Sequence, residues 1–251
     1  MVTTAAVTRS LDVARRTAAT RFSSMLIVVL SLSSPANAQT SPPAFPTEGA
    51  ILARENDFLA VWDVTRASEA TAPLEELTMD QVSVTLTPAA VKVTGPDGEW
   101  AIDYEPLGFV RFEPRGTIRS IAAVGDTPSR AVVFQIKTLP ASSWPMTEGI
   151  PGQFPRAGAV KLFEVNGIRV WDQTWAAGVP IANHLHYAPT AAVFVSGGAL
   201  RTIDKNGTNP PFSRSPGEVI SSTSPMAIPH EEEHVLGQPR AIWLELTPEH
   251  R

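Results

Sequence analysis

The stretch GVPIANHLHYAPTAAVFVSGG, residues 178–198, holds two histidines separated by one leucine, followed by a run of small and branched apolar residues. Residues i and i+2 of a strand point to the same face, so His184 and His186 would project together from one strand. Imidazole nitrogens are ligands for Fe, Mn, Zn, Ni and Cu. Paired histidines are also common on the solvated face of a sheet. The pair alone therefore leaves a metal site and a polar surface both open.

The sequence around this stretch is typical of an all-β protein. The chain has 23 prolines and 16 glycines in 251 residues, and its body shows no long run with helical periodicity. Val82, Val84 and Leu86 alternate with hydroxyl side chains, which is the period of a β-strand. We therefore predict short strands joined by turns in a sandwich or small barrel, of which the jelly roll fits best.

The sequence also repeats itself at a nearly constant offset. The tripeptide VWD occurs at residues 61–63 and again at 170–172, and turn-forming dipeptides begin at positions 97 and 206. Gly108 corresponds in the same way to Gly217, and RAVVFQI from Arg130 parallels RAIWLEL from Arg240, one residue out of step. Four markers in one order predict an internal duplication that produces two jelly-roll units.

The first residues have the pattern of a secretory signal peptide. Four arginines precede the apolar run MLIVVLSL, residues 25–32, and Ala36-Asn37-Ala38 fits the small-x-small cleavage rule. The run is roughly half the length that spans a bilayer, so we expect cleavage after Ala38 and a periplasmic or secreted protein; an uncleaved anchor is the alternative. Arg15-Arg16 leaves Tat export open beside Sec export.

These features predict how the chain is divided. The predicted segments are a signal peptide at 1–38, a proline-rich lead-in at 39–54, a first unit at 55–138, a linker at 139–164 and a second unit at 165–251. The formal net charge is −5 and no basic cluster follows Arg15-Arg16, so neither nucleic acid nor, after cleavage, a membrane is an expected partner. The absence of cysteine excludes disulfides, thiolate ligands and cysteine nucleophiles.

Residues 178–198 resemble the first motif of the cupin family, which places two histidines one residue apart, then a glutamate and then a glycine. Both histidines, Gly178 and Gly197 stand at matching positions, but the glutamate position holds Thr190, or Ala191 with the longer spacing.

Residues 216–246 resemble the second cupin motif, which is a Pro-Gly corner followed by a histidine and an asparagine. Pro216-Gly217 matches the corner, His230 matches the histidine, and His234 stands in the asparagine position. The resemblance covers about residues 165–246 and extends by the repeat to the first unit. It implies a bicupin, and because cupins often pair through sheet edges it also raises a homodimer.

The resemblance implies a three-histidine metal site in the second unit. His184, His186 and His230 would hold a divalent transition metal, which could be Fe, Mn, Zn, Ni or Cu. Cupins that lack the glutamate but keep three histidines include thiol and diketone dioxygenases. The side chains expected near these ligands are His234, Thr190 and Tyr187. His234 stands as a fourth ligand, as a group that orients His230, or as an exposed residue, and the last two together are favoured.

The three glutamates at 231–233 indicate a solvated acidic loop. If this segment is extended, only Glu232 shares a face with His230 and His234.

The first unit lacks a matching ligand set. At the offset of the repeat, the counterparts of His184, His186 and Thr190 are Glu75, Leu77 and Gln81, and Ser120 or Ile121 stands opposite His230. We therefore expect this unit to be a structural half that buries the edges and apolar faces of the other. Trp62 and Trp171 are equivalent by the repeat and are expected to anchor the cores rather than to bind substrate.

Two kinds of function fit this sequence, with a small molecule as the partner in both. The first is a metal-dependent, dioxygenase-like enzyme, whose catalytic residues the sequence does not identify. The second is a non-catalytic module that binds a small ligand or a metal, because a fold does not determine a function. A purely structural cupin, with incidental histidines, is a third.

Overall fold

The computed structural model describes residues 44–46, 49–66, 72–224 and 228–248. The predicted signal peptide and the first residues of the lead-in lie outside this part of the chain. The described residues form strands and no helix, so the all-β prediction is confirmed. Within the same residues there is no helix with the length and apolarity that crossing a membrane requires.

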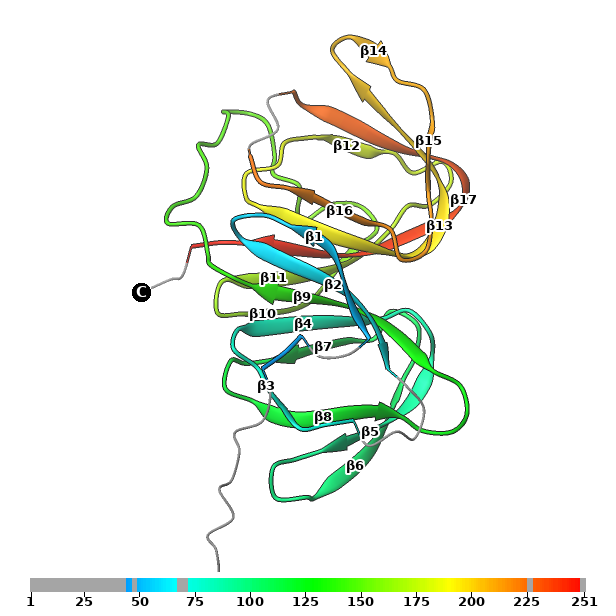
Figure 1. Cartoon of the computed structure of the whole chain (residues 1–251). Helices are drawn as coiled ribbons and strands as arrows, with labels where there is room; N and C mark the ends of the chain where they lie inside the picture. Colours follow the sequence, from blue (N-terminus) through cyan, green and yellow to red (C-terminus); the bar gives the residue numbers. More distant parts are fainter. Residues whose placement is uncertain (1–43, 47–48, 67–71, 225–227, 249–251) are drawn as a thin grey trace, which may run out of the picture. The chain divides into compact units, whose positions relative to one another are not determined.

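The first half of the described chain forms two sheets (Figure 1). One has the strand order β1-β2-β9-β4-β7, and the other has the order β3-β8-β5-β6. The strands are β1 (Ala50–Glu55), β2 (Leu59–Arg66), β3 (Glu75–Glu76), β4 (Asp80–Thr85), β5 (Ala89–Thr94), β6 (Trp100–Glu105), β7 (Val110–Glu113), β8 (Ile118–Ala123) and β9 (Ser129–Ile136).

The second half forms one sheet with the order β10-β11-β17-β13-β14, in which β12 pairs with β17 while β15 and β16 pair with β13. The strands are β10 (Ala159–Val165), β11 (Ile168–Thr174), β12 (Ile181–His184), β13 (Thr190–Asp204), β14 (Gly207–Thr208), β15 (Phe212–Arg214), β16 (Val219–Ser222) and β17 (His230–Leu246).

The long strand β17 serves both parts of this second sheet. Its end, residues 240–246, pairs with β11, whereas its start at His230 pairs with β12. Between these parts β17 passes so close to β13 that a Cβ on Gly198 would lie 2.5 Å from the Leu236 carbonyl oxygen. A glycine is therefore required where the strand pair changes register.

The two halves share a strand pattern. The path β1-β2-β9-β4-β7 has its counterpart in β10-β11-β17-β13, with β16 on β13. The β1–β2 pairing shifts register between Leu52 and Arg54, and the β10–β11 pairing shifts between Lys161 and Phe163. The second shift follows the first at the same offset that separates the two VWD tripeptides. This agreement supports the predicted duplication.

The apolar core between the two halves explains why the larger sheets are buried on both faces. Val61, Phe134, Val170 and Leu244 all belong to one buried cluster to which both halves contribute. Alternate residues of the same strands point inside their own half; for example Trp171 packs in a second cluster within the second half. The predicted strand with Val82 and Val84 is β4, and its serine and threonine side chains are also buried.

Two strands begin inside the predicted lead-in and the predicted linker. Strand β1 starts in the predicted lead-in, and β10 occupies the end of the predicted linker. The segment that joins the halves is therefore residues 137–158, which we call the connector. It forms an isolated parallel bridge, Gly152 with Leu185, next to the two histidines of the opening stretch.

Candidate metal centre

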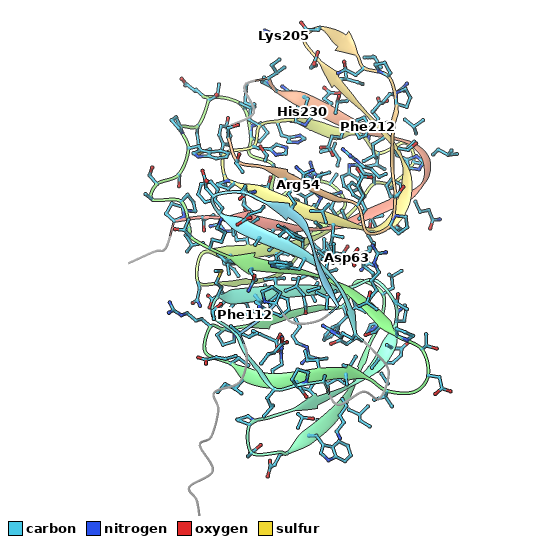
Figure 2. The ribbon with its side chains drawn as sticks, in the orientation of Figure 1. Arg54, Asp63, Phe112, Lys205, Phe212 and His230 are labelled. Carbon is cyan, nitrogen blue, oxygen red and sulfur yellow. The ribbon has the colours of Figure 1, made fainter. Side chains whose placement is uncertain are left out.

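Three histidines meet where β12 pairs with β17. His184 is the last residue of β12 and stands opposite His230, the first residue of β17, which is labelled in Figure 2. His186 lies two residues beyond His184, and the ring centroids of the three are 4.5 to 5.6 Å apart. All three side chains are buried. The structure therefore brings together the three residues that the sequence singled out.

Glu232 joins this cluster. One nitrogen of each histidine and one Glu232 oxygen all lie within 4.8 Å of one another. Glu232 Oε1 is 3.8 Å from His184 Nε2 and 3.7 Å from His230 Nε2, while the indole Nε1–H of Trp175 donates to Oε2 at 2.7 Å. The prediction of a solvated acidic loop is thus wrong for Glu232, which is buried on strand β17.

The donor set suits a divalent transition metal, which prefers imidazole nitrogen with a carboxylate oxygen. His186 is buried, and neither of its ring nitrogens has a hydrogen-bond partner among the described residues. Buried polar atoms are rarely left without a partner, so this residue points to a missing ligand. His184 Nδ1 lies 2.9 Å from the Ala182 carbonyl oxygen, which leaves Nε2 facing the cluster as an acceptor.

The electrostatics of the cluster favour the metal-binding forms of its members. Burial lowers the pKa of His184 to about 4 and that of His186 to about 3, so both imidazoles are neutral near pH 7. Burial alone would raise the pKa of Glu232. The Arg156 guanidinium and hydrogen bonds to the carboxylate outweigh it, so the pKa lies well below its usual range. Glu232 is therefore ionised.

Arg156 of the connector reaches the same cluster. Its Nη1 lies 3.2 Å from His184 Nε2 and 3.3 Å from Glu232 Oε2. The guanidinium carbon lies 5.0 to 5.6 Å from the ring centroids of Phe154, Trp175 and Trp243. Burial lowers the pKa of Arg156, partly offset by Glu232, but a guanidinium stays protonated in proteins. Sequence reasoning missed this residue, which stands in a segment without a periodic pattern.

The three side chains predicted to surround the ligands have different positions. Thr190 begins β13 and is buried, with no partner for its hydroxyl among the described residues. The Tyr187 hydroxyl accepts from Thr147 N at 3.0 Å and lies 3.1 Å from the Ile150 carbonyl oxygen, so Tyr187 fastens the connector. The His234 ring lies 2.7 Å from the Gly237 carbonyl oxygen, outside the four-residue cluster.

The first half has ion pairs where the second has histidines. Arg119 bonds both Glu75 and Glu113, and all three side chains are buried. Arg66 bonds Glu105 at 2.9 Å in the same half. Among the described residues, the group at His184 is the one in which three or more potential metal ligands converge.

Comparisons with known proteins identify the fold. No protein-family model and no curated protein matches the chain. The cupin 2 conserved barrel domain protein from Leptotrichia buccalis is similar, with TM-score 0.50, 11% identity and coverage of 79% of this chain and 88% of that chain. A variant of salicylate 1,2-dioxygenase from Pseudoaminobacter salicylatoxidans is similar with TM-score 0.53 and 12% identity, and the match covers 76% of this chain and 72% of that chain. A variant of oxalate decarboxylase from Bacillus subtilis is similar with TM-score 0.52 and 15% identity, and the match covers 85% of this chain and 76% of that chain.

The fold of the chain follows from these comparisons. The chain has the cupin fold, as the sequence resemblance implied. Identities of 15% or less show the fold and leave the function to be argued from the site.

Proposed function

We propose that this cupin-fold protein binds a divalent transition metal through His184, His186 and His230, and that the metal centre acts on a small molecule. The observation that carries the proposal is the convergence of four ligand atoms within 4.8 Å in a buried site. Buried His186 supports it, because neither of its ring nitrogens has a partner in the part of the chain that the structure describes, and an ion would satisfy one of them.

The solved structures with this fold support a metal-dependent function. Salicylate 1,2-dioxygenase has been crystallised with gentisate, and oxalate decarboxylase is described with Mn(II) centres. Both names describe chemistry on small molecules. We extend only the general class, a metal-dependent and dioxygenase-like reaction, to this chain.

Different residues of the site would have different roles in this function. A bound metal would supply a Lewis acid or an oxygen-activating centre. The imidazoles of the three histidines would hold it, Trp175 orients the Glu232 carboxylate, and the rings of Phe154 and Trp243 keep water from the guanidinium of Arg156. The low local dielectric strengthens every electrostatic contact with a ligand.

A non-catalytic binding module is the second candidate. It is favoured by the contacts of Glu232. Its Oε2 accepts a hydrogen bond from Trp175 and pairs with Arg156, while its Oε1 faces two histidines. A carboxylate with both oxygens engaged is a poor general base. A purely structural cupin would instead bind neither metal nor ligand.

Export and duplication belong to the same proposal. Cleavage after Ala38 would place the mature chain in the periplasm or outside the cell, and N-terminal sequencing of the exported protein tests this by finding Gln39 first. The shared strand pattern and the two register shifts, which recur at the offset of the sequence repeat, support an origin by duplication.

Metal content of the purified mature chain, residues 39–251 expressed with export, tests the proposal. We expect near-stoichiometric metal in the wild type and in His234→Ala, and almost none in the double variant His184→Ala/His186→Ala. His234 is the matched control because it lies on β17 but outside the cluster. A wild type without metal after incubation with Zn, Mn, Fe and Ni would contradict it. Oxygen uptake with small substrates then separates an enzyme from a binding module.

A further inference from the structure

Arg156 uses the atom of His184 that a metal would need. A ring nitrogen has one lone pair in the plane of the imidazole. Because a carbonyl oxygen can only accept, the 2.9 Å contact with Ala182 places the hydrogen of His184 on Nδ1. Nε2 therefore accepts from Arg156 Nη1 at 3.2 Å. A metal can bind Nε2 only if Nη1 leaves it.

The charges of the site predict what else must bind with the metal. Arg156 and Glu232 form a buried ion pair, in which one cation faces one anion. A divalent ion would add two positive charges to this buried site. Uncompensated charge in a buried site is costly, so an anion is the ligand that completes the centre.

The guanidinium of Arg156 is held ready for such an anion. Its Nε donates to Gln173 Oε1 at 2.9 Å, and Gln173 is in turn bonded to the Ala157 and Thr174 carbonyl oxygens. Nη2 is buried and has no partner among the described residues. Once Nη1 leaves His184, Nη1 and Nη2 form a fork that matches the two oxygens of a carboxylate.

Gln153 of the connector is a second group without a partner. It is 1% exposed, and neither its amide oxygen nor its amide nitrogen has a hydrogen-bond partner among the described residues. Its neighbour Gly152 bridges to Leu185, which stands between His184 and His186 in the sequence. An amide at this place can donate to an anion and accept from a neutral substituent.

We propose that the metal-loaded centre binds a small carboxylate, with Arg156 as its fork-shaped partner and Gln153 beside it. This inference rests on the proposed metal site and assigns the substrate class. It also makes metal and carboxylate binding cooperative, because each compensates charge that the other brings.

Calorimetric titration of the mature chain tests this proposal, with Zn²⁺ as the metal and acetate and benzoate as ligands. Acetamide and benzamide are the neutral controls of matching shape. We expect at least ten-fold tighter carboxylate binding to the Zn²⁺-loaded protein than to the metal-free protein, and no such gain for the amides. Sulfate that binds as tightly as the carboxylates would overturn the carboxylate assignment.

Two substitutions at Arg156 locate the anion. Arg156→Met should bind Zn²⁺ several-fold more tightly without an anion, since it removes the competing donor, and should lose at least ten-fold in benzoate affinity. Arg156→Lys keeps the positive charge but lacks the fork, and it serves as the control in case Arg156→Met fails to fold. Its benzoate affinity should lie between that of the wild type and that of Arg156→Met. The control is Arg201→Met, whose side chain is 40% exposed and bonds Glu233.

The outcomes separate the two proposals. If Zn²⁺ fails to bind the wild type and both Arg156 variants, the metal site itself is refuted. If Zn²⁺ binds but neither carboxylate gains affinity, or Arg156→Met binds benzoate like the wild type, the metal site stands and the carboxylate proposal is refuted.

Discussion

At the residue scale, Glu232 connects the groups of the candidate centre. It faces His184 and His230 with one oxygen and accepts from Trp175 and Arg156 with the other. Its negative charge is what allows a guanidinium to lie among three buried histidines. We therefore expect Glu232 to stabilise the fold without a metal and to offer an oxygen to a bound metal.

Replacing this carboxylate with an amide tests its structural role. Glu232→Gln leaves Arg156 buried without a counter-charge, and breaking a buried pair costs about 3–5 kcal/mol. Glu233→Gln is the matched control, because Glu233 pairs with half-exposed Arg201 and such pairs contribute about 0–1 kcal/mol. Urea unfolding with a chelator present measures both; equal losses in the two variants would refute the account.

The sequence could predict the histidines but not their partners. The i, i+2 spacing and the second motif single out His184, His186 and His230, because strand alternation fixes which side chains share a face. Glu232 shares that parity, yet three consecutive glutamates indicate solvent. Its burial depends on Trp175 and Arg156, which are distant in sequence, so only the folded chain shows it.

At the element scale, the connector is part of the site rather than a spacer. It bridges to Leu185 through Gly152, supplies Arg156, and is fastened by the Tyr187 hydroxyl. The sequence predicted a linker here but not its role, because a proline-rich segment carries no periodic pattern. It also missed β1 and β10, which are mostly exposed edge strands and so lack the alternation that marks a half-buried strand.

Removing the Tyr187 hydroxyl should loosen the connector alone. Tyr187→Phe leaves Thr147 N without its acceptor, and a hydrogen bond of about 1 kcal/mol corresponds to roughly five-fold faster local opening. Amide hydrogen exchange at Thr147 measures this, with the melting temperature expected to stay nearly constant. Tyr104→Phe is the control, because Tyr104 is exposed; unchanged exchange at Thr147 would contradict the assignment.

At the scale of the whole molecule, the repeated residues meet across the two halves. Arg130 bonds Asp63 of its own half and lies over Gly217 of the other; Arg240 bonds Asp172 and lies over Gly108. Three of the four markers of the repeat thus supply the residues of two equivalent contacts. The sequence predicted the repeat from these markers, but it could not show that they touch.

Substituting alanine for Gly108, which lies beneath Arg240, tests the contact between the two halves. Gly108 has φ +75°, and a Cβ there would lie 2.9 Å from Arg240, whereas Gly98 has φ +83° with nothing within 4 Å. Gly98→Ala should cost about 1 kcal/mol from backbone strain alone. Gly108→Ala should cost up to about 1 kcal/mol more, because the end of Arg240 must shift away from its partly exposed pair with Asp172. Equal unfolding free energies of the two variants would contradict this contact.

Anomalous diffraction from crystals of the mature chain grown with Mn²⁺ or Zn²⁺ tests the central claim most directly. The account predicts a metal peak bonded to nitrogens of His184, His186 and His230 at about 2.0–2.2 Å, with Arg156 Nη1 withdrawn from His184. A cluster without a peak, in which Arg156 still bonds His184 at saturating metal, would contradict it.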